Sequence, residues 1–362
     1  MCRYAQSYLE ISRSDLAENA RLVTGFVKCP VIGVVKCDGY GVSLAEAAAA
    51  WVSAGVTRLA VSEPQEALAL RRLGFAGVEI LLLSPAVCPE TLEALIAARV
   101  TLTVTGPDCA RRYAAAAAGR TVRVHVAVDT GMGRFGLHWR DLAAIEEVYQ
   151  TRGLTFTGIF SHFAASFARS DRLTRQQLER FLSVTRALAA KGYPVGLRHI
   201  ANSCAALRWP ETWLDAVRVG SALVGRLPVT VSLPLRRVGV YRAMVVERRT
   251  LHAGDTTGYA SLCRVRRATE VAVLSLGRHS GFGLVKRPET LRPLDFLVNQ
   301  LRLLRGCLHR PSVEYCGRTL PVVGRIGSQF TLVDAGGTDL APGDYVTAPV
   351  DLMLTPPERR FV

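Results

Sequence analysis

Lysine is scarce in this sequence. Of its 362 residues, 45 are basic, and only four of those are lysines: Lys28, Lys36, Lys191 and Lys286. The remaining basic residues are arginines, and against 30 acidic residues they leave a net charge of +15. The arginines occur singly or in pairs along the chain, without the basic stripe or tail that nucleic-acid binders carry. We therefore expect no nucleic-acid partner, and any chemistry that needs a lysine amine has few positions available.

Long apolar runs and paired cysteines are also missing. No apolar stretch approaches the roughly 18 residues that a membrane span needs, so we expect no contact with a membrane. The first ten residues lack the apolar run and cleavage site of a signal peptide. The nine cysteines are scattered, with no Cys-x-x-Cys pair, which favours free thiols and no bound metal. These absences predict a cytoplasmic protein.

Apolar strand-like runs alternate with amphipathic helical stretches from about residue 14 to 228. This alternation is typical of βαβ units and a parallel sheet. Eight strands in about 200 residues predict the α/β class and a (β/α)8 barrel, since an open sheet rarely has so many regularly spaced parallel strands. The expected strands are Val31–Val35, Arg58–Val61, Val78–Leu83, Thr101–Val104, Arg123–Val128, Thr155–Phe160, Leu197–Ile200 and Ala216–Val219.

The pattern changes after Pro228. Short runs rich in β-branched residues follow, separated by Gly-Asp and Gly-Gly turns, which predicts a mostly antiparallel β domain. We expect a barrel domain over residues 12–228 and a β domain over residues 229–362, joined by residues 1–11. The expected strands of the β domain include Tyr241–Glu247, Glu270–Ser275, Arg318–Val323 and Phe330–Val333.

Polar residues stand at the ends of five barrel strands, where functional side chains of such barrels gather. Each of them alone is more simply a solvated or structural residue, but together they indicate a site. The residues are Lys36 with Tyr40, Asp129 to Arg134, Ser161 with His162, Asn202 with Ser203, and Arg218 to Ser221.

This set of side chains favours one cofactor. A lysine at an apolar strand end can lose hydration, which lowers its pKa and suits it to Schiff-base formation. Ser203, Gly220 and Ser221 offer hydroxyl and backbone N–H groups for a phosphate near the last two strands. A lysine beside a phosphate site points to pyridoxal 5'-phosphate.

At this point the motifs resemble those of the alanine racemase family, the barrel-type pyridoxal-phosphate enzymes. The stretch from Val128 to Gly136, which contains Asp-Thr-Gly-Met-Gly-Arg, is the most specific match. Others follow in the family's order along nearly the whole chain. They are Val34–Gly41, Gly158–Ala164, Ala201–Ser203, Val217–Gly220 and Gly258–Ala260.

The resemblance implies an amino-acid racemase that works with two bases. Lys36 would hold the cofactor and act as one base. Tyr259 would be the other base, reaching the site from the partner subunit of a homodimer. Arg134 and Ser328 would contact a free amino acid substrate. The residues implied to bind the cofactor are Lys36, Tyr40, His162, Asn202, Ser203, Arg218, Gly220 and Ser221, with His199 supporting Arg218.

The sequence departs from the family pattern around the substrate. Ala127 stands where the family often has a carboxylated lysine. The entrance stretches read Gly277–Gly281 and Gly327–Phe330, and Pro356 or Pro357 replaces a gate tyrosine after an expected last strand at Asp351–Thr355. Alanine is the expected substrate.

Other readings remain open at this stage. Serine or a larger or basic amino acid is an alternative substrate, and a cofactor-binding homologue without activity is a further one. A barrel-type decarboxylase would carry an acidic residue where Arg218 stands. A single-barrel cofactor carrier would lack the β domain.

Overall fold

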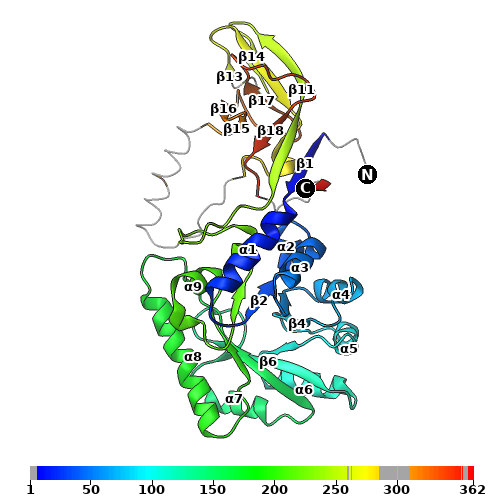
Figure 1. Cartoon of the computed structure of the whole chain (residues 1–362), viewed down its shortest axis with the longest axis vertical. Coiled ribbons are helices and arrows are strands. Elements are labelled where there is room, and N and C mark those ends of the chain that lie inside the picture. The colour runs from blue at the N-terminus through cyan, green and yellow to red at the C-terminus, as the bar shows by residue number, and fades with distance from the viewer. Residues whose placement is uncertain are drawn as a thin grey trace. The chain divides into compact units, whose positions relative to one another are not determined.

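The computed structural model describes residues 6–258, 261, 263–284, 300, 310–351, 353 and 358–362. The chain forms two compact units (Figure 1). One unit is Arg13–Val238, and the other combines Met1–Ser12 with Gly239–Val362. The segment 229–238, which the sequence analysis assigned to the β domain, thus lies with the barrel.

Eight parallel strands close into a barrel in the first unit. Hydrogen bonds give the orders β10-β2-β3-β4 and β5-β6-β8-β9. Parallel bridges from Leu81 to Thr101 and from His199 to Ala216 join these two groups at both edges. The predicted (β/α)8 barrel is therefore confirmed. Its strands are β2 (Val31–Val34), β3 (Arg58–Val61), β4 (Glu79–Leu82), β5 (Leu102–Val104), β6 (Val122–Asp129), β8 (Leu154–Phe160), β9 (Leu197–His199) and β10 (Val217–Val219).

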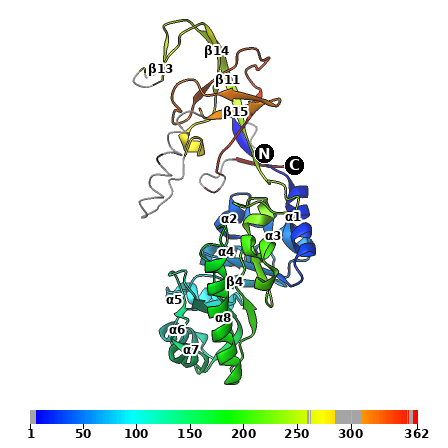
Figure 2. The same cartoon turned by 90° about the vertical axis from the view of Figure 1, so that its left-hand side faces the viewer.

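Helices lie outside the strands (Figure 2). Because the strands are covered on both faces, they read as continuous apolar runs, and all four residues of β2 are buried. Ile32, Val34, Ala60, Leu81 and Ala216 form a core cluster contributed by neighbouring strands. The helices are α1 (Arg13–Phe26), α2 (Lys36–Tyr40), α3 (Leu44–Ser53), α4 (Pro64–Arg72), α5 (Pro89–Ala97), α6 (Pro107–Ala117), α7 (Leu142–Tyr149), α8 (Arg172–Ala190) and α9 (Ser203–Arg208).

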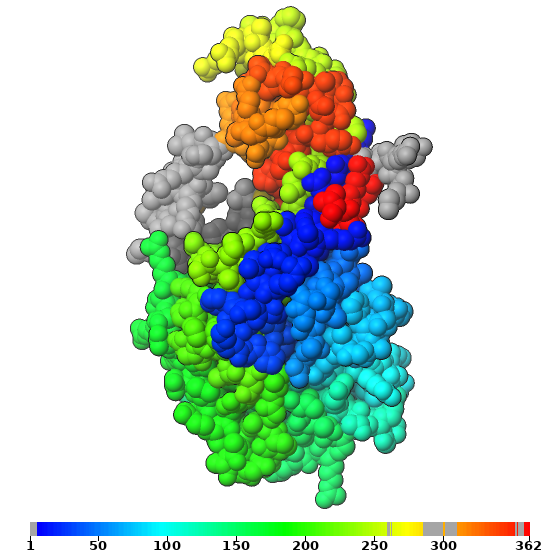
Figure 3. Space-filling model, viewed as in Figure 1, coloured from blue at the N-terminus to red at the C-terminus, as the bar shows by residue number. Residues whose placement is uncertain are grey.

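Helix α1 is fixed to the barrel by a buried amide. Asn19 is fully buried, and its Nδ2 donates to the carbonyls of Leu223 at 3.3 Å and Arg236 at 2.7 Å. Its Oδ1 accepts from the Arg236 amide at 2.9 Å. Helix α1 also packs beside α3, and both lie on the face shown in Figure 3. These contacts hold the last segment of the unit against its first helix.

The second unit is built on one mostly antiparallel sheet. Its long strand β11 (Val240–Leu251) pairs with β1 (Ser7–Ile11), β14 and β18, and a register shift lies between Val245 and Glu247. The β1–β19 pair is parallel. The other strands of this sheet are β14 (Thr269–Leu274), β15 (Ser312–Tyr315), β16 (Arg318–Pro321), β17 (Thr331–Asp334), β18 (Tyr345–Ala348) and β19 (Glu358–Phe361).

The C-terminal strand differs from its expected position. Asp351 and Met353 lie outside any strand, and the last strand is β19, paired with β1. The prediction of a strand at Asp351–Thr355 is thus wrong for these two residues, and 352, 354 and 355 lie outside the described residues. Pro356 and Pro357 also lie outside them.

Candidate functional site

A left-handed turn follows β2 and carries the first two site residues. From Cys37 to Gly41 every residue has a positive φ, between 50° and 85°. Non-glycine residues reach this conformation at a cost of roughly 1–2 kcal/mol each, so tertiary contacts must hold the turn. Asp38 supplies them, because its Oδ1 accepts from the Leu44 amide at 2.7 Å and its own amide donates to Glu66 at 3.1 Å. The turn places Lys36 and Tyr40 at the C-terminal end of the strand.

Tyr40, Ser203 and Gly220 form a cradle that depends on the missing side chain at position 220. A Cβ on Gly220 would overlap the hydroxyl of Tyr40. Ser203 Oγ accepts from the amides of Gly220 at 3.1 Å and Ala222 at 3.3 Å, which leaves its own proton for an acceptor. Burial, reinforced by nearby Cys37 and Glu66, raises the pKa of the Tyr40 phenol, which keeps its proton. The cradle therefore presents hydroxyl donors.

The amide of Asn202 has a supporting position. Its Oδ1 accepts from the Ala205 amide at 3.2 Å and from the Ser166 hydroxyl at 2.7 Å. The first bond caps helix α9 and the second ties the loop after β8 to that cap. Asn202 thus fixes the backbone next to Ser203, while Ser221 begins the short 3₁₀ helix Ser221–Val224 beside Gly220.

Arg218 on β10 lies buried, with 4% of its surface exposed, among acceptors from β8 and β9. Its Nη1 donates to the His199 carbonyl at 2.9 Å and to His199 Nδ1 at 2.8 Å. Its Nη2 donates to the Ser161 carbonyl at 2.6 Å and to His162 Nδ1 at 3.1 Å. Burial, followed by the charge of Arg134, lowers the pKa of Arg218 to about 9, so it stays charged at neutral pH.

The guanidinium determines which histidine nitrogens carry protons. Arginine can only donate, so Nδ1 of His199 and of His162 must accept. Each neutral ring then carries its proton on Nε2. His199 Nε2 lies 2.9 Å from His125 Nδ1 and donates to it. His125 in turn holds its proton on Nε2, which faces Glu79 Oε1 at 3.9 Å. A directed chain of neutral imidazoles thus runs through the barrel interior.

Burial keeps these three rings neutral. Burial and then the charge of Arg218 lower the pKa of His199 far below its ordinary value. Burial, partly opposed by Glu79, lowers the pKa of His125 to about 4. Burial and the charges of Arg218, Arg134 and Lys36 lower the pKa of His162 to about 3. The approach of His125 to Glu79 is therefore not an ion pair at neutral pH.

The loop after β6 is held by one carboxylate. Asp129 Oδ1 accepts from the amides of Gly131 and Met132, both at 2.8 Å, and of Gly133 at 3.1 Å. Although burial opposes it, these three amides lower the pKa of Asp129. Arg134 is exposed at the end of the loop, with its guanidinium carbon 5.4 Å from the centre of the Phe135 ring.

Gln177, fully buried on α8, joins this loop to the next one. Its Nε2 donates to Thr130 Oγ1 at 3.3 Å and to the His162 carbonyl at 3.0 Å. Its Oε1 accepts from the Ala164 amide at 2.9 Å. With Ala127 buried in β6, these contacts, the Asp129 bonds and a bond from Arg180 Nη1 to the Thr130 carbonyl at 2.8 Å position the loop that carries Arg134.

The barrel residues expected at the site thus occupy the ends of neighbouring strands. Lys36 and Tyr40 follow β2, Arg134 follows β6, and His162 follows β8. Asn202 and Ser203 follow β9, and Arg218, Gly220 and Ser221 end and follow β10.

Of the two site residues predicted in the β unit, the structure describes only Ser328. Ser328 is exposed, and its loop bonds to the 3₁₀ turn Arg278–Ser280 through His279 N to Ser328 O at 2.9 Å. Tyr259 lies outside the described residues.

Three residues near the site were not expected from the sequence: His125, Phe160 and Gln177. The Phe160 ring lies against Arg218, with the guanidinium carbon 5.1 Å from its centre, and stacks on His199 at 5.1 Å between ring centres. The one signal for His125 was a titratable residue flanked by apolar residues in a strand. Gln177 gave none, because a polar residue on a long helix usually faces water.

Two findings concern the described part of the chain only. It contains no group of three or more His, Cys, Asp or Glu side chains placed to hold a metal ion. None of its helices is both long and apolar enough to cross a membrane.

A closed parallel barrel with a lysine, a hydroxyl cradle and a buried arginine at its strand ends defines the class: a (β/α)8 enzyme joined to a β domain. The family model described as alanine racemase, N-terminal domain, matches residues 11–228. The alanine racemase of Desulforamulus reducens is 36% identical over 92% of this chain and 85% of its own. That of Desulfosudis oleivorans is 32% identical over 94% and 86%.

Solved structures agree with these matches. The alanine racemase of Streptomyces lavendulae, a producer of D-cycloserine, has a TM-score of 0.83 at 26% identity and covers 98% of this chain and 97% of its own. That of Clostridium difficile has a TM-score of 0.86 at 23% identity and covers 100% and 97%. The chain belongs to the alanine racemase family.

The cradle generates a prediction at position 220. Replacement Gly220→Ala should displace Tyr40 and weaken binding of pyridoxal phosphate by about tenfold or more, the value of one charge-assisted hydrogen bond. Spectroscopic titration of the apoprotein measures this affinity. Gly25→Ala is the matched control, because a Cβ there has nothing within 4 Å. Equal affinity of Gly220→Ala and wild type would contradict the cradle.

The neutral histidines predict a pH dependence of stability. Below a pH of about 6.5 the unfolded chain binds protons that the folded chain excludes. The free energy of unfolding therefore decreases as the pH is lowered. Each buried ring contributes up to about 1.4 kcal/mol per pH unit. Urea unfolding at several pH values between 7 and 5 gives the free energy of unfolding as a function of pH. The slope of this dependence should be shallower for His125→Gln than for wild type, by about one proton. The exposed His138→Gln should keep the wild-type slope, and an unchanged slope in His125→Gln would contradict the assignment.

Proposed function

We propose that this protein interconverts L- and D-alanine with pyridoxal 5'-phosphate. The observation that carries the proposal is the buried Arg218 guanidinium at the end of β10, next to the cradle of Tyr40, Ser203 and Gly220. Relatives named alanine racemase that cover most of the chain support the same reaction. The other substrates considered from the sequence have no comparable support.

The residues present fit the cofactor. The space that a Cβ on Gly220 would fill is shaped by Tyr40, and the Ser203 hydroxyl faces the same backbone. Tyr40, Ser203, Gly220 and Ser221 would hold its phosphate, with Asn202 fixing the backbone beside them. When bound, pyridoxal phosphate supplies an electron sink that lets the substrate's Cα release its proton.

Arg218 would hold the ring nitrogen of the cofactor by donating a hydrogen bond from Nε, because its Nη hydrogens bond to His199, Ser161 and His162. Because its pKa of about 9 keeps it charged and it can only donate, it leaves that nitrogen without a proton. An unprotonated ring nitrogen would withdraw electrons less strongly from the substrate, which would limit side reactions. The neutral His162 would lie beside the ring, and His199 fixes the orientation of Arg218 from behind.

Two bases on opposite faces of the substrate would invert its α-carbon. Lys36, half-buried at the end of β2, would hold the cofactor covalently and move the proton on one face through Nζ. Tyr259 would move the proton on the other face through its phenolic oxygen, and its pKa must then be lowered by neighbours. Arg134 would hold the substrate carboxylate, and Ser328 would contact the substrate.

We further propose a homodimer in which Tyr259 reaches the partner's barrel. The exposed side chains Met132, Phe135 and Phe167, on the loops after β6 and β8, offer apolar surface for such contact. Free thiols, including Cys29 and Cys204, suit a reducing compartment such as the cytoplasm. The unit proposed to bind the cofactor is Arg13–Val238, and the unit proposed to make the partner contact is Met1–Ser12 with Gly239–Val362.

A panel of L-amino acids tests the function. The purified holoenzyme should racemise alanine faster than serine, lysine or larger amino acids, as measured by chiral chromatography.

Lys36→Ala should lose the visible absorbance of the bound cofactor and the activity. Tyr259→Phe should keep the absorbance but lose activity, far more in one direction than in the other. Activity on no amino acid, or Tyr259→Phe activity unchanged in both directions, would contradict the proposal.

A further inference from the structure

A hollow lies in the barrel unit, at the opposite ends of the strands from Lys36. Its volume is about 1020 Å³, and it is formed by the segments that enter β3, β4, β5 and β6. Five arginines and a single carboxylate, Glu79, line it. A hollow of this size is large enough for a small organic ligand. The arginines are Arg58, Arg71, Arg99, Arg120 and Arg123.

Two of these arginines build the wall. Arg71 donates to the carbonyls of Ala98 at 2.8 Å, Val78 at 2.8 Å and Arg99 at 3.0 Å, and so joins the ends of α4 and α5. Arg120 donates to the carbonyls of the α6 end, among them Ala117 at 3.1 Å. Their charges remain, because a carbonyl satisfies the hydrogen-bonding group without neutralising it.

Glu79 balances only one positive charge. Its Oε2 accepts from Arg58 Nε at 3.0 Å and its Oε1 from Thr101 Oγ1 at 3.2 Å. Among the described residues, Arg99 and Arg123 have no carboxylate within salt-bridge distance, and both are exposed toward solvent. Burial and then the charge of Arg123 lower the pKa of Arg71, so the charges repel each other. The hollow therefore has a surplus of positive charge.

The backbone at Arg99 adds an independent observation. Arg99 has a φ of 53°, in the left-handed region that arginine rarely adopts. It follows α5 at the turn into the next strand. The second residue after α3, α4, α6 and α8 is a glycine with a positive φ: Gly55, Gly74, Gly119 and Gly192. After α6 the preceding Ala118 is left-handed as well. Keeping an arginine where glycine fits best costs stability, and such strain concentrates at functional positions.

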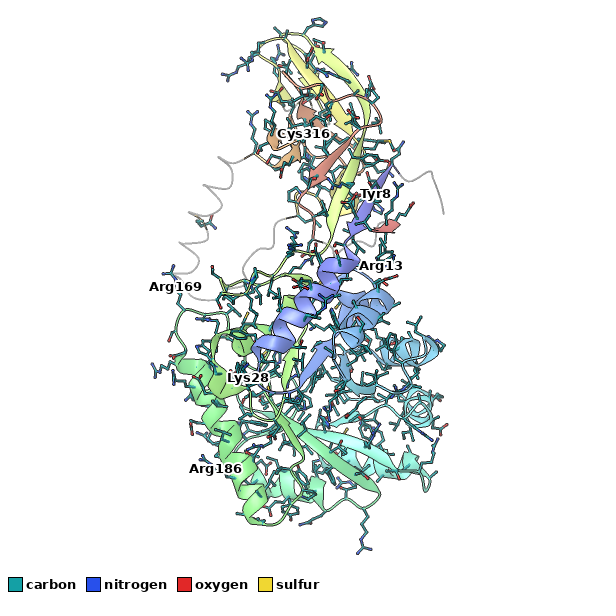
Figure 4. The ribbon with its side chains drawn as sticks, viewed as in Figure 1. Tyr8, Arg13, Lys28, Arg169, Arg186 and Cys316 are labelled. Atoms are coloured by element: carbon teal, nitrogen blue, oxygen red, sulfur yellow. The ribbon has the colours of Figure 1, made fainter. Side chains whose placement is uncertain are left out.

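We propose that this arginine-lined hollow binds a small organic anion with two or more negative groups. Guanidinium forks match phosphate and carboxylate oxygens in pairs, and several of them favour a multiply charged ligand. Arg169 and Arg186, by contrast, are exposed on the surface of the barrel unit, as Figure 4 shows. The hollow thus gathers five of the arginines that contribute to the net charge of +15 on one concave surface. Its ligand leaves the Lys36 end of the barrel open.

Calorimetric titration of the holoenzyme tests the site, because bound cofactor already fills the cradle at the other end. The probes are inorganic tripolyphosphate and citrate, each at low and at physiological ionic strength. We expect saturable binding that weakens with salt. Binding of tripolyphosphate alone assigns a phosphorylated ligand, binding of citrate alone assigns a polycarboxylate, and binding of both assigns the shared oxyanion chemistry.

Matched variants separate the site from general surface charge. Arg99→Gly should weaken probe binding by about tenfold, the value of one charge-assisted contact, while its Tm equals or exceeds that of wild type. Arg123→Ser should act in the same direction. Arg152→Ser removes an exposed arginine from the turn after α7, outside the hollow, and should change affinity less than twofold. No saturable binding, unchanged affinity in both pocket variants, or an equal loss in Arg152→Ser would overturn the proposal.

Discussion

The buried guanidinium of Arg218 is the interaction on which the site depends. A charged group with 4% exposure is expensive to desolvate unless every donor has a partner. Two carbonyls in or just after β8 and β9 and two imidazole nitrogens provide partners for its Nη hydrogens. These acceptors lie on the two barrel strands that precede β10, so the packing of β8, β9 and β10 against one another accommodates the guanidinium. The packing of these three strands therefore also assembles this part of the site.

The electrostatics of the interior follow from that charge. Because Arg218 donates to Nδ1 of His199 and His162, both rings carry their proton on Nε2. His199 then donates to Nδ1 of His125, which fixes the tautomer of that ring too. Every acceptor of the chain is occupied while the rings stay neutral. Removing a proton acceptor at any link would leave a buried donor without a partner, which costs about 1–3 kcal/mol. The rigid orientation of Arg218 that results is what a fixed contact to a ring nitrogen requires.

Around this centre, several positions with proposed roles have a strained or constrained backbone, although others without such roles, such as Ala118 and Leu214, also have a positive φ. The left-handed turn from Cys37 to Gly41 is strained, and it carries Lys36 and Tyr40. Gly220 has no side chain, which allows Tyr40 to approach its backbone. Arg99 occupies a glycine conformation at the opposite end of the barrel. Elsewhere, proline begins α4, α5 and α6, and a capping side chain begins α3, α7 and α9, as local propensity favours.

Much of the fold could be predicted because buried parallel strands read as continuous apolar runs. All eight barrel strands lie within a residue or two of their expected bounds. The strands β1 and β19 were harder, since their pairing joins the two ends of the chain and has no local signal. The side chains at strand ends were predictable from topology, whereas His125 was not. Its partner His199 is 74 residues away and becomes its neighbour only when β6, β8 and β9 pair in one sheet.

The most direct test is nitrogen NMR of the histidine side chains in the 15N-labelled holoenzyme at pH 7. The account predicts that His125, His162 and His199 are neutral and carry their protons on Nε2, as the donating guanidinium of Arg218 requires. Assignment by single substitution identifies each ring. A proton on Nδ1 of His199, or a doubly protonated ring at any of the three positions, would contradict the account.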